Sequence, residues 1–275
     1  MVNLVIVFVS FLMLMNITTV KSADRVVSIN LCTDQLAMMV ADTDQLISVS
    51  FLATEARFSA MSEEAKTYRI NHGFAEEIYM MNPDLVLAGT FSSSATTDML
   101  RRLNIPVRAF KPANSIADVG ELLEEMGRVL GRESKAKHIA DAYNMKVASL
   151  QEEISTRPKA ALYYANSYTL GNKSLAGQIL FAAGFDNIAA SAGVASGGYL
   201  PLEILAVLEP DAVITSRPYR RISRAEEVII HPLIKRMRKE LNSRVFTDQD
   251  WICGTPFVLR AIEEMNSFRI DITEG

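Results

Sequence analysis

The sequence is poor in the residues from which metal centres are built. Its 275 residues include three histidines and two cysteines, Cys32 and Cys253. Two thiols cannot form a metal cage by themselves, and their spacing matches no zinc pattern. A metal-cluster protein of the nitrogenase type would need several more cysteines. The composition therefore argues against a resident metal or cluster bound directly by the chain.

The sequence also lacks the common catalytic signatures. It has no G-x-S-x-G elbow, no G-x-G-x-x-G or Walker loop and no H-E-x-x-H pair. The histidines His72, His138 and His231 lie far apart in the chain, and no serine or carboxylate accompanies them in a known pattern. We therefore expect a binding protein. An exported α/β enzyme and a structural or adhesive exported protein are the alternative classes.

An excess of positive charge is missing as well. Lys and Arg number 28 against 32 Asp and Glu, which gives a net charge of −4. A nucleic-acid partner would require a basic face, so none is expected. The arginines at positions 217, 220, 221 and 224 form a local cluster that Glu226 and Glu227 follow. This cluster is either a solvated helix start or a rim site for an anionic ligand.

A long hydrophobic run is absent. The apolar stretch Val2–Ile17 carries no charge, but it is shorter than the roughly 20 residues that span a membrane. Small residues follow it up to Ser22, which predicts a signal peptide over residues 1–22, with cleavage at Ser22 or Ala23, and export to the periplasm. The first cysteine, Cys32, lies too far along for lipidation. In an oxidising compartment Cys32 and Cys253 could form a disulfide, and the sequence leaves that pairing open.

From Arg25 onward, short apolar runs alternate with amphipathic stretches, as in parallel sheets built from βαβ units. Strands are predicted at Val26–Ile29, Leu46–Ser50, Leu85–Ala88, Val107–Phe110, Ala160–Tyr164, Ala212–Thr215 and Arg244–Thr247. Helices are predicted at Thr33–Ala41, with Thr33 or Asp34 as the cap, at Leu175–Ala183 and at Pro256–Phe268. The pattern predicts one lobe over residues 23–113 and another over residues 156–275.

Residues 114–155 differ from both flanks because they are almost continuously helical. Ser115 and Asp118 form an acidic capping box at the start. Gly131 interrupts the apolar periodicity, and a second helical pattern follows it. A helix of 20 residues is about 30 Å long, so the second helix is long enough to bridge two lobes.

One segment of the first half recurs in the second. Glu76 lies seven residues before Pro83-Asp84, and Glu203 lies seven residues before Pro210-Asp211. Each proline follows a short amphipathic stretch and precedes an apolar strand, an arrangement typical of a helix stop and turn. The repeat predicts two related lobes. The glutamates are either placed there because the helix dipole favours a negative charge at a helix start, or they dock on a basic partner. Their spacing does not separate these roles.

Several of these features together resemble a known family. They are the segment from Arg25 to Leu36, the two Glu-x₆-Pro-Asp units, the long central helix, and Asp250-Trp251 before the last helix. The resemblance is to the helical-backbone metal-receptor proteins, the periplasmic binding proteins of ABC importers for ferric siderophores, haem and vitamin B12, and it covers essentially the whole mature chain.

That resemblance implies two α/β lobes with parallel sheets, joined by one long backbone helix, with a ligand cleft between them and little hinge closure. It implies that Glu76 and Glu203 dock on arginines of the permease, through which the ATPase acts. We expect a monomer that captures a ferric siderophore, cobalamin or haem, with no covalent cofactor and no direct metal ligand. The sequence does not choose among these chelates. The lone tryptophan, Trp251, departs from the aromatic cradle of the vitamin B12 binder.

Ligands of open α/β sheets sit outside the carboxyl ends of the strands, which selects candidate cleft residues. They are Asn30, Cys32, Phe51, His72, Thr90, Phe91, Tyr168, Tyr199, Arg217, Tyr219 and Trp251. A lone histidine such as His72 is more often a surface or capping group than a metal ligand. Trp251 is either part of the core or a stacking platform for a flat ligand.

Overall fold

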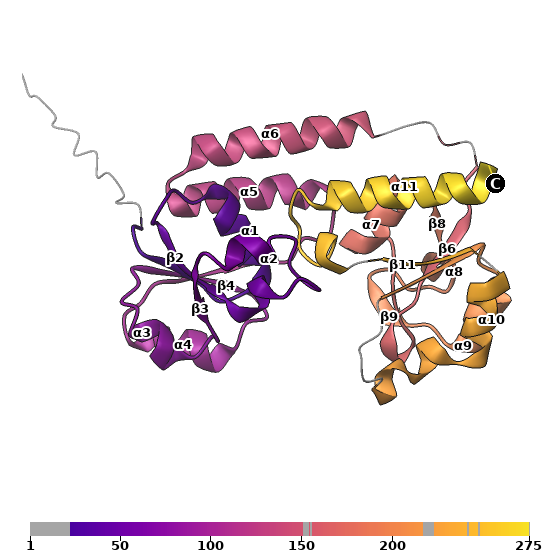
Figure 1. Ribbon diagram of the computed structural model, residues 1–275, viewed down its shortest axis with the longest axis horizontal. Coiled ribbons are helices and arrows are strands. Elements are labelled where there is room, and N and C mark those ends of the chain that lie inside the picture. Colours follow the sequence, from indigo (N-terminus) through magenta and orange to yellow (C-terminus); the bar gives the residue numbers. More distant parts are fainter. Residues whose placement is uncertain are drawn as a thin grey trace, which may run out of the picture.

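The computed structural model has two α/β lobes side by side, with helices running along one edge of both (Figure 1). It describes residues 23–150, 154, 156–216, 223–240, 242–246 and 248–274. The predicted signal peptide and the candidates Arg217 and Tyr219 lie outside these ranges. Within them, no helix is both long and apolar enough to cross a membrane.

The first lobe contains a parallel sheet of five strands in the order β3-β2-β1-β4-β5. The strands are β1 (Val26–Ser28), β2 (Leu46–Ser50), β3 (Arg69–Asn71), β4 (Leu85–Gly89) and β5 (Val107–Phe110). Four helices surround them: α1 (Leu31–Val40), α2 (Ser62–Ala65), α3 (Ala75–Tyr79) and α4 (Ser94–Arg102). The four predicted strands are confirmed, and the edge strand β3 was not predicted.

The second lobe contains a parallel sheet in the order β11-β10-β6-β8 and a separate antiparallel ribbon of β7 and β9. The strands are β6 (Lys159–Leu162), β7 (Tyr168–Leu170), β8 (Asp186–Asn187), β9 (Gly197–Tyr199), β10 (Ala212–Ser216) and β11 (Asn242–Phe246). The α-helices are α7 (Leu175–Ala182), α8 (Ile188–Ser191), α9 (Leu202–Val207), α10 (Pro232–Glu240) and α11 (Val258–Glu274).

The two Pro-Asp units make the same contacts in their lobes. Asp84 accepts a hydrogen bond from the Arg25 amide at 3.0 Å and donates its own amide to the Arg25 carbonyl. Asp211 accepts from the Lys159 amide at 2.7 Å and donates to the Lys159 carbonyl. Each aspartate thus fastens the end of a short helix to the start of a central strand. The predicted repeat is confirmed at the level of individual hydrogen bonds.

The lobes are connected by an antiparallel pair of helices, α5 (Ala117–Leu130) and α6 (Glu133–Ser149). The predicted capping box is present: the Ser115 hydroxyl accepts from the Asp118 amide, and the Asp118 carboxylate accepts from the Ser115 amide. Gly131 ends α5 with a φ of 66°, the left-handed conformation that glycine adopts without strain. This turn reverses the chain, so the connection is a helical pair and not one helix.

Helix α6 is the element of that pair whose ion pairs and hydrogen bonds reach both lobes. Lys135 at its start donates to the Ala41 carbonyl of the first lobe at 2.7 Å. Lys146 near its end pairs with Glu263 of α11 at 3.3 Å. Its 17 residues give a length of about 25 Å. Helix α6 thus has the predicted length and contacts both lobes.

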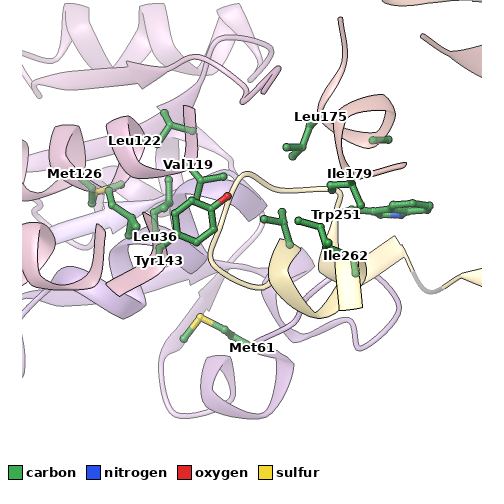
Figure 2. Packing of buried hydrophobic residues seen from close by; sticks show 14 of the residues in the cluster. Leu36, Met61, Val119, Leu122, Met126, Tyr143, Leu175, Ile179, Trp251 and Ile262 are labelled. Atoms are coloured by element: carbon green, nitrogen blue, oxygen red, sulfur yellow. The ribbon is translucent and has the colours of Figure 1, made fainter. Parts of the chain in front are cut away.

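A single hydrophobic cluster runs through both lobes and the helices between them. Leu36 of α1 and Met126 of α5 belong to it, as do Ile179 of α7 and Ile262 of α11 (Figure 2). Tyr143 of α6 packs between these groups and donates its hydroxyl to the Ile116 carbonyl at 2.9 Å. Close-packed interiors are hard to compress and transmit strain between their parts. The cluster therefore holds the lobes as one unit.

The predicted cap of α1 was wrong. The helix starts at Leu31, and Asn30 caps it because its side-chain oxygen accepts from the amides of Cys32 and Thr33. The expected caps are engaged elsewhere. The Thr33 hydroxyl bonds to the Asn30 carbonyl, and Asp34 accepts hydrogen bonds from Ser50 at the end of β2.

Candidate functional site

A disulfide between Cys32 and Cys253 joins the lobes where their sheets face each other. Cys32 lies in the first turn of α1, and Cys253 lies in the loop that precedes α11. The two cysteines are 221 residues apart in sequence, and their Cα atoms are 5.1 Å apart. The pairing that the sequence left open is present. It gives the lobes a covalent link besides the chain that passes through α5 and α6.

A pocket of about 400 Å³ lies beside this disulfide. Tyr164, Tyr168 and Trp251 line it from the second lobe, and Ala113 lines it from the segment that leaves the first lobe. Pockets for small molecules typically have volumes of about 300–1,000 Å³ and mostly apolar walls with a few polar groups. The volume and the lining fit that description.

A second pocket, of about 140 Å³, lies on the other side of the same loop. The ends of the first lobe's strands line it, with Asn30 after β1, Thr90 and Phe91 after β4, and Lys111 after β5. Ala113 and Ile252 line both pockets. The pockets therefore adjoin, and we refer to the two together as the cleft floor.

Polar groups below this floor fix the backbone. A Cβ atom at Gly89 would lie 2.9 Å from the Asn30 side-chain nitrogen, so a larger residue there would displace the side chain that caps α1. Asn71 donates from its buried side chain to the Ser28 carbonyl and the Ser48 hydroxyl. These contacts hold the strand ends, and with them the pocket residues, in register.

Asp34 lies fully buried behind the cleft and accepts hydrogen bonds from the amide and hydroxyl of Ser50. Burial raises its pKa to about 6, although the hydrogen bonds from Ser28 and Ser50 act in the opposite direction. Ionisation of Asp34 at neutral pH therefore opposes folding. This carboxyl supports the site from below and does not line either pocket.

An exposed aromatic stack lies on the first lobe. The rings of Phe51 and His72 are 5.8 Å apart and nearly parallel, and the Phe74 ring stacks on the other side of His72 at 6.5 Å. The Glu77 carboxylate accepts a hydrogen bond from the His72 backbone amide at 2.8 Å. Its other oxygen lies 3.5 Å from Nδ1 of the His72 ring. Phe51 and His72, both predicted cleft residues, are thus brought together, but they lie apart from the residues that line the two floor pockets.

The second lobe presents tyrosines from the β7–β9 ribbon. Tyr168 and Tyr199 are partners in its antiparallel register, and both side chains are exposed. The Tyr168 hydroxyl would lie 2.0 Å from a Cβ at Gly197, so that glycine leaves room for the ring. Aromatic side chains therefore stand on both lobes.

Trp251 belongs to the core, one of the two roles that the sequence allowed, and it also reaches a pocket. It is only 6% exposed and belongs to the shared hydrophobic cluster, near Ile179 in Figure 2. It also lines the larger floor pocket. The preceding Asp250 forms an ion pair with Arg260 of α11, which fixes the start of the loop that carries Trp251 and Cys253.

Asn30, Cys32, Thr90, Phe91, Tyr168 and Trp251 therefore line the cleft floor, and Tyr199 adjoins it through Tyr168. Many other lining residues were missed, and two of them, Lys111 and Ile252, show why. Lys111 follows a correctly predicted strand, so the strand-end rule could have found it. Ile252 carried no signal, because its position depends on the disulfide beside it.

A larger hollow, of about 790 Å³, lies between the linking helices and the second lobe, where Tyr143, Val147 and Phe181 line it. It contains no strand end of the first lobe, and we do not assign the site to it. Across the described ranges, no group of three or more His, Cys, Asp or Glu side chains is arranged to hold a bare metal ion.

A comparison with known families identifies the architecture. The profile of the periplasmic binding protein family matches residues 26–250, which includes both lobes and the linking helices. The chain belongs to the periplasmic binding protein family. Members of this family are binding proteins.

Curated relatives of this periplasmic binding protein include a cobalamin-binding protein of Halobacterium salinarum, which is 27% identical over 221 residues. That alignment covers 78% of this chain and 60% of the relative, so the chain spans about three fifths of the relative's length. The uncharacterised ABC transporter substrate-binding lipoprotein YvrC of Bacillus subtilis is 24% identical, with 73% of this chain and 66% of YvrC covered.

Solved structures with the same fold include two chelate-binding proteins. The periplasmic heme-binding protein RhuT of Roseiflexus superposes with a TM-score of 0.74 at 18% identity, covering 91% of this chain and 99% of RhuT. The periplasmic vitamin B12-binding protein BtuF of Vibrio cholerae gives 0.70 at 16% identity, with 92% and 99% covered. At these identities the similarity shows that the two-lobed fold is shared.

Proposed function

We propose that this periplasmic binding protein captures a metal chelate in the interlobe cleft and delivers it to an ABC importer. The observation that carries the proposal is the cleft floor, where two adjoining pockets are lined from both lobes around the Cys32–Cys253 disulfide. A ligand bound there would contact strand ends of the first lobe and tyrosines of the second. Family membership and the cobalamin-binding relative support this function.

We propose a ferric siderophore, cobalamin or haem as the ligand. Exposed aromatic rings stand on both lobes, with Phe51, His72 and Phe74 on the first and Tyr168 and Tyr199 on the second. Such faces suit a broad ligand with apolar and π surfaces. Lys111 supplies a cation at the floor, which suits the carboxylate or catecholate oxygens that these chelates carry.

We propose further that Glu76 on α3 and Glu203 on α9 dock on basic residues of the permease, which passes the ligand inward with the help of its ATPase. Both glutamates are exposed and lie in the first turns of equivalent helices. In Figure 1, α3 and α9 lie on the side of the two lobes that faces away from α6. Two acidic contacts on one face suit a membrane partner that receives both lobes at once.

The proposal assigns residues 1–22 to a cleaved signal peptide, residues 23–113 and 156–275 to the two lobes, and residues 114–155 to the linking helices. The mature protein would act in the periplasm as a monomer. Support comes from the apolar start of the sequence and from a disulfide of the kind that forms in oxidising compartments.

Fluorescence of Trp251 tests ligand capture, because the lone tryptophan of the chain lines the larger floor pocket. Purified mature protein is titrated with hemin, cyanocobalamin, a ferric catecholate and a ferric hydroxamate, with inner-filter controls. We expect saturable quenching by one compound at micromolar or tighter affinity, and a weaker affinity for Tyr168→Ala. Calorimetry that shows no binding of any of the four would contradict the chelate proposal.

A further inference from the structure

Each docking helix presents an exposed apolar side chain one turn after its glutamate. On α3 this residue is Met80, directly after the helix, and on α9 it is Val207. Both side chains are 77% exposed. Residues four apart lie on the same face of a helix, so Glu76 and Met80 form one pair on the surface, and Glu203 and Val207 form another.

Isolated exposed apolar residues are common on protein surfaces, but these two occupy equivalent positions. Each lies three residues before the proline of its Pro-Asp unit. The backbone after them also matches, since Asn82 and Glu209 have left-handed φ values of 48° and 47°. Methionine and valine differ in shape, so what the two halves share is the apolar character and the exposure of the position.

Other apolar side chains enlarge both surfaces. Tyr79 is exposed beside Glu76, and Ile204 is exposed beside Glu203. A charge surrounded by apolar groups is well shielded from water once a partner covers it, and charge pairs shielded in this way have the stronger couplings across interfaces. The composition of both surfaces therefore suits a partner with a basic group beside an apolar socket.

We propose that each docking contact consists of a glutamate and the apolar residue one turn later, Glu76 with Met80 and Glu203 with Val207. The proposal rests on permease docking as proposed above and specifies the partner surface. That surface has two equivalent basic and apolar sites, as a homodimeric or internally duplicated permease provides. Helix α6, the shared core and the disulfide fix the spacing of the two pairs, so both can engage without a reorganisation cost.

Photo-cross-linking in cells of the native host tests this proposal with the full chain. The cross-linking residue p-benzoylphenylalanine is placed, one position at a time, at Met80, Val207, Glu76, Glu203 and Met145. Met145 is a matched control, since it is 69% exposed and lies on α6. We expect positions 80 and 207 to give cross-links to the same polytopic permease, identified by mass spectrometry, and position 145 to give none.

The pattern of cross-links separates the two levels of the proposal. Cross-links from positions 76 and 203 without any from 80 and 207 would overturn the apolar contact and leave docking in place. No permease cross-link from any of the four would overturn both. Equal labelling from position 145 would show that the contact is unspecific, which also overturns the proposal.

The permease complex identified in this way then gives the size of the effect. Binding of labelled mature protein to the complex in nanodiscs is measured for wild type, Met80→Ser, Val207→Ser and Met145→Ser. Loss of one buried apolar side chain should weaken binding by about tenfold for each docking variant, with no change for Met145→Ser. Unchanged melting temperatures would show that the variants fold. Wild-type affinity in both Met80→Ser and Val207→Ser would contradict the proposal.

Discussion

The two lobes are alike where they face away from the cleft and different where they face into it. The first lobe orders four of its strands β2-β1-β4-β5, and the second lobe orders its sheet β8-β6-β10-β11 in the same pattern. The Pro-Asp units and their helices also match. At the strand ends, by contrast, the first lobe carries the Phe51–His72–Phe74 stack after β2 and the edge strand β3, whereas the second carries the β7–β9 ribbon.

A duplicated fold can meet two different requirements, one set by its partner and one set by its ligand. A symmetric partner favours keeping equivalent surfaces in both halves, and α3 and α9 meet that condition. An asymmetric ligand has different groups on its two sides, so the two halves of its site gain by diverging. The comparison therefore suggests which surfaces serve which purpose. The following predictions break or sharpen it, from the largest expected effect to the smallest.

Removing the link between the lobes should have the largest effect. Cys32→Ser/Cys253→Ser frees two points that are 221 residues apart in sequence. Loss of a bridge that closes so long a loop should lower the free energy of unfolding by about 4 kcal/mol. Denaturant unfolding with and without reductant measures this. Reductant should destabilise the wild type and leave the variant unchanged, and equal stability of the two oxidised proteins would refute the expectation.

The pH dependence of stability should reveal Asp34. Its folded pKa of about 6 lies above the ordinary value of 3.8, so between about pH 4 and 6 the folded protein keeps a proton that the unfolded chain has already released. Stability therefore falls as pH rises through that window. Two pKa units correspond to about 3 kcal/mol, and Asp34→Asn should remove this loss in denaturant unfolding measured from pH 4 to 7.

Asp118 provides a control of opposite sign for that experiment. Burial raises its pKa, but hydrogen bonds from Ser115 and from the Asn114 amide outweigh this and lower it overall. Its contribution to stability should be present above its unfolded pKa and lost as pH falls. Asp118→Asn should therefore weaken the protein at pH 7 more than at pH 3. The same pH profile for both variants would contradict the assignment.

The divergent cleft surfaces should each contribute to ligand affinity. Phe51→Ala removes one ring of the first lobe's stack, and Tyr199→Ala removes a ring from the ribbon. Each loss should weaken binding of the chelate found by titration by about tenfold, because an aromatic contact contributes about 1 kcal/mol or more. Phe181→Ala is a matched control, since Phe181 is exposed but lines the hollow between the linking helices and the second lobe. Calorimetry compares all three variants.

Sequence reasoning found the parts of the fold that repeat or have strong periodicity. The central strands are buried on both faces and read as short apolar runs, and the Pro-Asp units occur twice. It missed β3 and the β7–β9 ribbon because Arg69–Asn71 and Gly197–Tyr199 have no apolar pattern. Those segments become strands only because the sheet edge and the ribbon partner supply their hydrogen bonds.

The site was less accessible to sequence reasoning than the fold. The strand-end rule found the floor residues of the first lobe, because each follows a predicted strand. It could not show that Trp251 is largely buried or that Ile252 lies between the two pockets, since both depend on a loop that a disulfide draws to the other lobe. Long-range contacts of that kind leave no local pattern in a sequence.

The smallest predicted effect concerns the Pro-Asp units, which the two lobes share. Asp84→Ala and Asp211→Ala each remove a carboxylate that accepts a hydrogen bond from the start of a central strand, Arg25 or Lys159. Losing such a bond should cost about 1–2 kcal/mol of unfolding free energy, and Asp84→Ala should cost slightly more than Asp211→Ala because Asp84 also accepts from the Asp24 amide. Denaturant unfolding of the single and double variants checks this, with Asp98→Ala on the surface of α4 as the control. The two aspartates are in different lobes, so the losses of unfolding free energy should add in the double variant. Strongly unequal losses would mean that the two repeated hydrogen bonds contribute differently to stability, and that the lobes match in shape alone.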